Sequence, residues 1–168
     1  MAKSLELLEE APDFKLRQVG GEMFHFCESV KQFEGWHLII FFRGAWCPVC
    51  VQDLKDLEQQ RGYFEDKKIR LVTIATDEMT NLENMVEEHE LHFPVLHADD
   101  LETLMNYGVH YHGADAPYED HGEHGEPAHF LINETGHLLY QQVQTSPFGR
   151  PSATELRKII QYIKKNLI

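Results

Sequence analysis

Two cysteines three residues apart, Cys47 and Cys50, are the residues of this sequence whose types and spacing most directly suggest chemistry. They follow the apolar run "HLIIFF" and stand where a helix is expected to begin. Backbone N–H groups at a helix N-terminus favour a thiolate. We therefore predict that Cys47 attacks as an exposed, acidified thiol. Cys50, one turn further and more shielded, then resolves the resulting mixed disulfide or sulfenic acid.

Two neighbours of this pair add to the prediction. Arg43, four residues before Cys47, is placed to bring a positive charge to the thiol. Trp46 directly precedes Cys47, and we expect it to shield the thiol and to form part of a surface on which a partner docks. Simple packing of Trp46 on the loop is compatible with both roles.

A zinc site is the alternative interpretation of a Cys-x-x-Cys pair. Structural zinc sites need four ligands, and the sequence has no second cysteine pair. Cys27 stands alone and is expected to be a semi-buried apolar residue. Histidines remain as alternative ligands, but a strand–loop–helix position favours redox chemistry.

A histidine-rich segment, residues 110–126, is expected to be a long loop that leads directly into Pro127. Loops of this length usually carry function or are disordered. We predict a flexible lid or a partner-contact loop, with a metal site as the weaker alternative because the ligand spacing is irregular. His129, just beyond, is expected to point at the active site. The weak candidates for metal ligands are His110, His112, His121 and His124.

The elements that must position these residues alternate between strand and helix patterns. Strands are expected at 37–42, 69–76 and 93–97, and hairpins at 14–26 and 127–145. Helices are expected at 48–67 with a break near Gly62, at 77–91 capped by Asp77, at 100–108 ended by Gly108, and at 151–167 capped by Ser152 or Thr154. This order predicts an α/β sandwich with a mixed sheet, parallel at first and antiparallel at the end.

Length and composition set the remaining limits. A chain of 168 residues suggests one domain, 1–168, with no cofactor requirement visible. The net charge of -13 argues against binding to nucleic acid or to an anionic membrane surface. The start lacks a signal-like apolar core, and three cysteines are too few for a secreted disulfide scaffold, so a cytoplasmic location is expected.

Four motifs resemble the peroxiredoxin-like (AhpC/TSA) family of the thioredoxin superfamily. They are "APDFKL" at 11–16, "FFRGAWCPVC" at 41–50, "FPVLHADDLETLMNYGV" at 93–109 and "PAHFLINETGHLLY" at 127–140. The resemblance implies a thioredoxin-like fold, a central mixed sheet flanked by helices with an N-terminal β-hairpin extension. It also implies a peroxidatic role for Cys47 and reduction by thioredoxin or a similar dithiol. A homodimer fits as well, since many members are dimers.

Three positions depart from typical members of that family. Ile40 and Gly44 stand where those members have a proline and a threonine before the cysteine, and Pro127 stands at the position of an arginine that helps to bind peroxide. The standard peroxide pocket is therefore not reproduced, and Arg43 is the residue that we expect to supply the missing charge.

Pro127 stands in a segment similar to one in thioredoxins, whereas Phe41 stands at a position where thioredoxins differ. "GEPAHF" is similar to the segment whose cis-proline stands opposite the thiols there, so we predict a cis bond at Pro127, with a trans proline at a strand start as the alternative. Pro94 is the lesser candidate. Phe41 replaces the buried aspartate of thioredoxins, so proton transfer from Cys50 needs water, another carboxylate or a nearby histidine.

The preferred hypothesis is a thiol-dependent antioxidant oxidoreductase that reduces peroxides, disulfides or both. The family resemblance favours peroxide, whereas the Cys-x-x-Cys pair and Pro127 favour a protein disulfide. One alternative is a thioredoxin-like disulfide reductase without peroxidase activity. Another is a non-catalytic metal-binding or redox-sensing module that uses the histidine-rich loop.

Overall fold

This computed structural model describes residues 4–113 and 121–168, and seven of the strands in this part of the chain form one sheet. Its order is β2-β1-β5-β4-β3-β8-β9. These strands are β1 (Lys15–Gln18), β2 (Met23–His25), β3 (Trp36–Phe41), β4 (Ile69–Ala75), β5 (Val95–His97), β8 (Ala128–Ile132) and β9 (Leu138–Val143). A second sheet pairs β6 (Tyr111–His112) with β7 (His124–Gly125).

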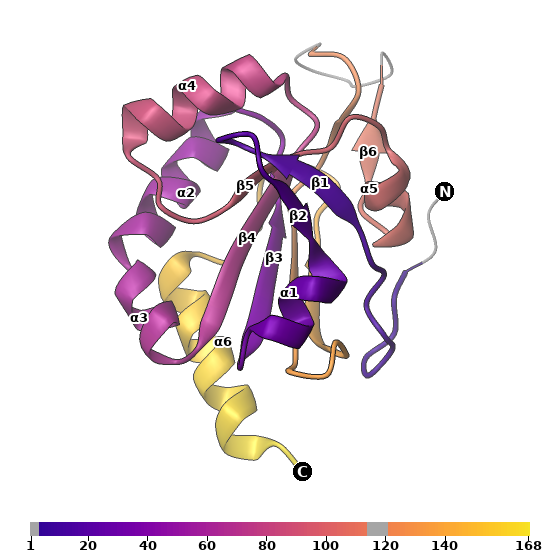
Figure 1. Cartoon of the computed structure of the whole chain (residues 1–168), viewed down its shortest axis with the longest axis vertical. Helices are drawn as coiled ribbons and strands as arrows, with labels where there is room; N and C mark the ends of the chain where they lie inside the picture. The colour runs from indigo at the N-terminus through magenta and orange to yellow at the C-terminus, as the bar shows by residue number, and fades with distance from the viewer. Residues whose placement is uncertain (1–3, 114–120) are drawn as a thin grey trace.

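Six helices surround the sheet in the described residues. They are α1 (Phe26–Gln32), α2 (Pro48–Gln59), α3 (Arg61–Asp66), α4 (Met79–His89), α5 (Glu102–Asn106) and α6 (Ala153–Asn166). Figure 1 shows the central strands β3 and β4 running between these helices. None of the helices described in 4–113 and 121–168 combines the length and the apolar character needed to cross a bilayer.

The central strands have the mixed arrangement that the sequence predicts. β3 pairs in parallel with β4, and β4 with β5, whereas β8 runs antiparallel to both β3 and β9. All six residues of β3 are buried, as an apolar run covered on both faces requires. The carboxyl ends of β3 and β4 therefore meet at one edge of the sheet, where the loop before α2 begins.

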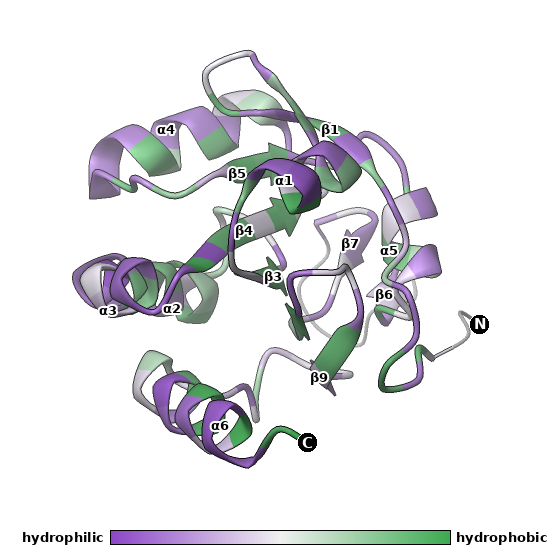
Figure 2. Cartoon of the chain, turned by 60° about the horizontal axis from the view of Figure 1, so that its bottom comes forward, coloured by the Kyte–Doolittle hydropathy of each residue, from purple (hydrophilic) through white to green (hydrophobic). Residues whose placement is uncertain are grey.

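Two apolar clusters occupy the two faces of the sheet, because side chains alternate along each strand. Leu38 and Ile40 face a cluster that includes apolar side chains from α2, α3, α4 and α6. Ile39 and Phe41 face a second cluster with residues of α1 and α5. Figure 2 shows α2, α3, α4 and α6 gathered on one side of the strands and α5 on the other. The layered α/β sandwich with helices on both faces is thereby confirmed.

The N-terminal hairpin is also confirmed. β1 and β2 pair antiparallel around a turn in which Gly20 and Gly21 have φ values of 106° and 96°. Glycine adopts this left-handed backbone without steric cost. β1 then pairs antiparallel with β5, so the hairpin extends the central sheet beyond its parallel strands.

The first long helix is broken as expected, but at Gln60, two residues before Gly62, which lies inside α3. One expected helix cap is wrong. Asp77 does not cap α4, which has Glu78 at its N-cap without a side-chain cap. The Asp77 carboxylate instead accepts the backbone N–H of Ala45 at 2.8 Å, so it fastens the loop before α2.

Other element ends follow the sequence more closely. Ser152 caps α6 in a reciprocal capping box with Glu155, and Gly108 follows α5 with φ 71°. The segment 110–126 contains the strands β6 and β7, so it is more ordered than the expected loop. Its centre, residues 114–120, lies outside the described residues, and its role as a lid or partner contact stays a prediction.

Candidate active site

Cys47 stands at the N-cap of α2, with φ -95° and ψ 107°. Pro48 follows at the first helical position, where a missing N–H costs nothing. The sulfur of Cys47 accepts the backbone N–H of Cys50 at 3.3 Å. A thiol sulfur therefore takes the place of the oxygen that usually caps a helix, at the positive end of its dipole.

The loop that carries Cys47 is held from both sides. The N–H of Ala45 is bound by Asp77, which follows β4 at the same edge of the sheet. Gly44 lies against the indole of Trp46, and a Cβ atom at this position would collide with that ring. The sequence position of Gly44 is thus explained by close packing rather than by peroxide binding.

A buried ion pair lies beside the nucleophile. The register of β3 against β8 sets Phe41 opposite Ala128, and two residues further this places Arg43 opposite Glu126. Arg43 Nε donates to Glu126 Oε1 at 2.9 Å, with 3% and 1% of the two side chains exposed. Arg43 Nη1 also approaches the sulfur of Cys47 at 3.9 Å. The predicted positive charge near Cys47 is present in this geometry.

The two thiols differ strongly in acidity. Hydrogen bonding to the Cys50 thiol lowers the pKa of Cys47 to about 5, together with the Cys50 backbone N–H and the Arg43 guanidinium, and against the effect of burial. Burial and the hydrogen bond to Cys47 raise the pKa of Cys50 far above its ordinary value. At neutral pH the pair therefore holds one thiolate, on Cys47, and one thiol, on Cys50.

The expected exposure of Cys47 is wrong. Only 1% of Cys47 is exposed, and Cys50 is completely buried. The reason is that Trp46 packs against the apolar cluster to which Cys47 belongs, while Arg43 lies against its sulfur. Val49, on the outer side of the same turn, is 40% exposed. The acidity of Cys47 thus arises from local donors and not from contact with solvent.

The histidine-rich segment packs on Trp46. The ring of His121 stacks on the indole at a centroid distance of 3.9 Å, and His124 meets it edge-on at 5.1 Å. The segment therefore lies beside the thiols. Within the described residues no three or more His, Cys, Asp or Glu side chains are grouped to hold a metal ion. This covers the weak candidates His110, His112, His121 and His124.

The expected cis bond at Pro127 is wrong, since the described residues contain no cis peptide, at Pro127 or at Pro94. The backbone N–H of Glu126 donates to His110, and Gln144 donates to the carbonyl of Pro127, at 2.8 and 2.9 Å. These bonds hold an extended segment that leads into β8, a position that a trans proline tolerates. Pro127 remains next to the site because Glu126 contacts Arg43.

A second set of polar side chains lies behind Cys50, namely Asp53, His129 and Arg150. Of these, His129 alone was expected near the active site. A cavity of about 10 Å³ is lined by Cys50, Asp53, His129 and Arg150 together with apolar side chains. His129 was expected to face the active site and lies on this cavity. Asp53 follows Cys50 by three residues on one helix face, a spacing that could have signalled it. Arg150 is about one hundred residues away in sequence and gives no such signal.

The fold and the thiol pair at the start of α2 define a class of protein, the thiol oxidoreductases with a thioredoxin-like fold. The model of the AhpC/TSA family matches residues 7–141, and the chain belongs to this family.

Curated relatives and solved structures agree with this class. ResA, a thiol-disulfide oxidoreductase of Bacillus thuringiensis subsp. konkukian, is 25% identical over 97% of this chain and 80% of its own. ResA of Halalkalibacterium halodurans is 22% identical over 91% of this chain and 76% of its own. AhpC of Mycobacterium tuberculosis has a TM-score of 0.79 at 15% identity, covering 96% of this chain and 99% of its own. Peroxiredoxin 6 of Arenicola marina reaches a TM-score of 0.83 at 16% identity, covering 96% and 74%.

Proposed function

We propose that the protein is a thiol–disulfide reductase in which Cys47 is the nucleophile and Cys50 the resolving thiol. The Cys47 thiolate attacks a substrate disulfide, forms a mixed disulfide and releases one substrate thiolate. Cys50 loses its proton and attacks the Cys47 sulfur, which releases the second substrate thiolate and leaves a Cys47–Cys50 disulfide. A dithiol such as thioredoxin then reduces this disulfide and returns the enzyme to its starting state.

The observation that carries this proposal is the position of Cys47 at the start of α2, where its sulfur accepts the N–H of Cys50. Cys50 stands in the first turn of α2, three residues after Cys47, so this bond brings the Cys47 sulfur to the turn that carries the second thiol. Cys50 is thus within reach of the sulfur that it must attack. The names of the ResA relatives support a disulfide as the substrate.

Peroxide reduction is the second candidate, and Arg43 is the observation that favours it. Its guanidinium lies beside the nucleophilic sulfur, where it is placed to bind a peroxide oxygen. The Cys47 thiolate would attack one peroxide oxygen as the O–O bond breaks, which gives a sulfenic acid, and the other oxygen would leave with the electron pair and take a proton to become an alcohol or water. Cys50 would then form the same disulfide and release water.

Paired turnover assays separate these two activities. Insulin disulfide reduction is measured as the rate above that of dithiothreitol alone, and hydrogen peroxide consumption is measured with a thioredoxin system, for the unmodified protein, Cys47→Ser and Cys50→Ser. Cys27→Ser is the matched control, because Cys27 lies at the start of α1, away from the thiol pair. We expect insulin reduction to be lost in both active-site variants and retained in Cys27→Ser.

The outcomes have distinct meanings. Peroxide consumption that depends on Cys47 adds the second activity, whereas its absence leaves the disulfide reductase alone. Absence of both activities in the unmodified protein overturns the enzymatic proposal. A non-catalytic redox-sensing or metal-binding module is then the favoured function. If Cys50→Ser blocks the first covalent step more than Cys47→Ser, the roles of the two thiols are reversed.

A further inference from the structure

The cavity behind Cys50 brings together polar groups from three separate parts of the fold. Asp53 comes from α2, His129 from β8, and Arg150 from the segment before α6. The remaining lining is apolar, so these groups are the polar members of this cavity beside Cys50. The cavity measures about 10 Å³, which is close to the space that one buried water requires.

Two buried polar atoms at this cavity lack hydrogen-bond partners within the described residues. They are Nδ1 of His129 and Oδ2 of Asp53. Oδ2 lies 3.1 Å from Nη1 of Arg150, so the two form an ion pair without a well-directed hydrogen bond. Buried polar atoms are normally satisfied, and orphaned ones beside a reactive thiol point to a transferable proton or a bridging water.

Arg150 is fixed in a position to act on this site. Its Nε and Nη2 both donate to the carbonyl oxygen of Pro147, at 2.9 and 2.7 Å. Only 7% of its side chain is exposed. The remaining edge of the guanidinium faces Asp53, and its positive charge favours the thiolate form of Cys50. A fixed cation therefore stands where negative charge develops when Cys50 loses its proton.

Cys50 needs a base, because burial raises its pKa far above neutrality. Burial raises the pKa of Asp53, although Arg150 opposes this, so the carboxylate becomes a stronger base than an ordinary aspartate. Burial, followed by the charge of Arg150, lowers the pKa of His129 to about 3. His129 is therefore neutral near pH 7 and can relay a proton but does not store one.

We propose that Asp53 and Arg150 form the proton-transfer site of the resolving thiol, a role that rests on the proposed disulfide reduction. As Cys50 attacks the mixed disulfide on Cys47, the Cys50 proton passes to Asp53, directly or through a water in the cavity. Arg150 stabilises the emerging thiolate. The new Cys47–Cys50 bond forms as the bond between Cys47 and the substrate sulfur breaks, and that sulfur leaves with the electron pair. Asp53 later returns the proton to solvent or to the released thiolate.

A two-step reaction with the aromatic disulfide DTNB isolates this proton transfer. Attack by Cys47 releases one coloured thiolate, and attack by Cys50 releases the second, so the two steps are observed separately. The test uses the Cys27→Ser protein, so that the two active-site thiols alone react. The variants are Asp53→Asn and Arg150→Gln, with Asp53→Glu to retain the carboxylate.

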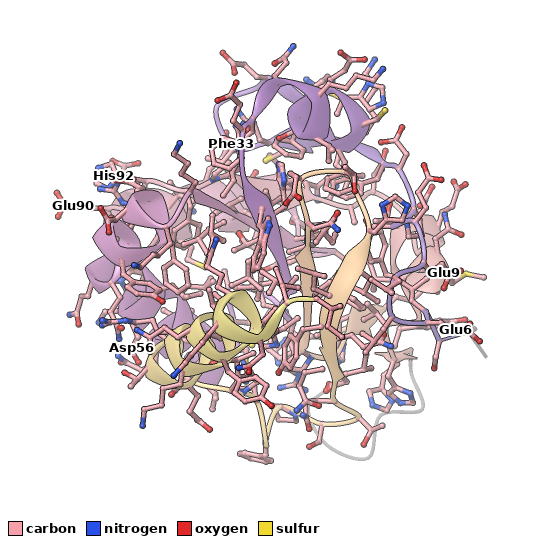
Figure 3. The ribbon with its side chains drawn as sticks, turned by 90° about the horizontal axis from the view of Figure 1, so that it is seen from below. Glu6, Glu9, Phe33, Asp56, Glu90 and His92 are labelled. Carbon is pink, nitrogen blue, oxygen red and sulfur yellow. The ribbon has the colours of Figure 1, made fainter. Side chains whose placement is uncertain are left out.

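Two control variants match these changes in charge. Glu90→Gln removes a carboxylate at the end of α4, and Glu90 lies at the rim of the molecule, outside the cavity lining (Figure 3). Arg61→Gln removes an arginine that pairs with Glu58 and Glu65 on α2 and α3, away from the thiols. Both controls should release the two thiolates at the unmodified rates.

The pH profile of the second release distinguishes proton transfer from a structural role. The charged or titratable groups that act on Cys50 or on Asp53, or that line the cavity with them, are Cys47, Asp53, Asp56, His129 and Arg150. In the unmodified protein the second release should become independent of pH above the pKa of Asp53. In Asp53→Asn it should be slower by about a hundredfold near pH 7 and should rise with hydroxide until it reaches the unmodified rate. Asp53→Glu should keep the plateau.

Arg150→Gln should slow the second release and move the start of the plateau to higher pH, because Arg150 lowers the pKa of Asp53. An Asp53→Asn profile that is parallel to the unmodified one, or identical to it, overturns the proposal. Absence of a second release in the unmodified protein overturns the resolving role of Cys50 and with it this proposal. A normal second release that is indifferent to Asp53 overturns the proton-transfer site alone.

Discussion

The guanidinium of Arg43 and the carboxylate of Glu126 form an ion pair with an Nε–Oε1 distance of 2.9 Å, and both side chains are almost completely buried. Glu126→Ala leaves the Arg43 charge buried without this partner, so the free energy of unfolding should fall by about 3–5 kcal/mol. Urea unfolding measures the loss. The exposed pair Lys31–Glu28 is the control, and Glu28→Ala should change stability by less than about 1 kcal/mol.

The acidity of Cys47 can be measured by alkylation. In the Cys27→Ser protein the rate of reaction with iodoacetamide should rise through an inflection near pH 5. Cys50→Ala should move this inflection to higher pH, because the hydrogen bond from Cys50 is the main cause of the low pKa. An inflection near pH 9 in the unmodified thiol would falsify the electrostatic account of the nucleophile.

The same thiol links stability to pH. The pKa of Cys47 is about 5 in the folded protein against an ordinary value of 9.0, so folding favours the thiolate. This stabilisation is fully present above pH 9 and is lost as the pH falls through 5. The unfolding free energy of the unmodified protein should therefore rise between pH 5 and 9 relative to that of Cys47→Ser. Equal slopes for the two proteins in urea titrations would contradict this linkage.

Buried His37 should make the protein sensitive to acid. Burial, followed by the charge of Arg70, lowers its pKa to about 4 from 6.5. The unfolded chain therefore binds the proton more readily, and stability falls as the pH drops from 6.5 to 4, by about 1.4 kcal/mol per pH unit. His37→Gln should flatten this dependence in urea unfolding. His92→Gln, at an exposed histidine, should not.

The bond from the Ala45 N–H to the Asp77 carboxylate should contribute to the order of the active-site loop. Asp77→Ala removes the acceptor, and unfolding stability should fall by about 1–3 kcal/mol. Hydrogen exchange at the Ala45 amide should become faster. Asn81→Ala is the control, since Asn81 donates to the other oxygen of Asp77 and its removal leaves the acceptor of the Ala45 N–H in place. Unchanged exchange at Ala45 would show that another contact fixes the loop.

Much of the fold could be predicted because the local patterns agree with the packing. The run 36–41 is apolar except for His37 and is buried throughout, and Gly20-Gly21 forms the expected turn. Asp77 is a residue for which the local pattern gives the wrong interaction. A carboxylate before a helix is a good cap by sequence, but the loop N–H of Ala45, more than thirty residues away, binds it instead.

The part of the site near the thiols in sequence could be predicted in detail, whereas of the distant residues His129 alone was expected to face it and lies on the Cys50 cavity. The local spacing identifies Cys47, Cys50 and Arg43, because these lie within one strand–loop–helix segment. Glu126 and Arg150 reach the same thiols from 79 and 100 residues beyond Cys47 or Cys50, through the register of β8 and the path of the chain before α6. Nothing near Arg150 marks it as a neighbour of the thiols, whereas Glu126 directly precedes Pro127, whose segment is expected opposite them. The burial of Cys47 likewise depends on Trp46, whose orientation the sequence does not determine.

Because the Cys47 sulfur caps α2, its contacts depend on its oxidation state. A sulfur in a disulfide carries no charge. It therefore lacks the electrostatic attraction to the helix N-terminus and to Arg43 that stabilises the Cys47 thiolate. The dithiol is thus stabilised relative to the disulfide, and the equilibrium with external thiols shifts toward the reduced protein. The helix start that makes Cys47 reactive also makes its disulfide comparatively easy to reopen.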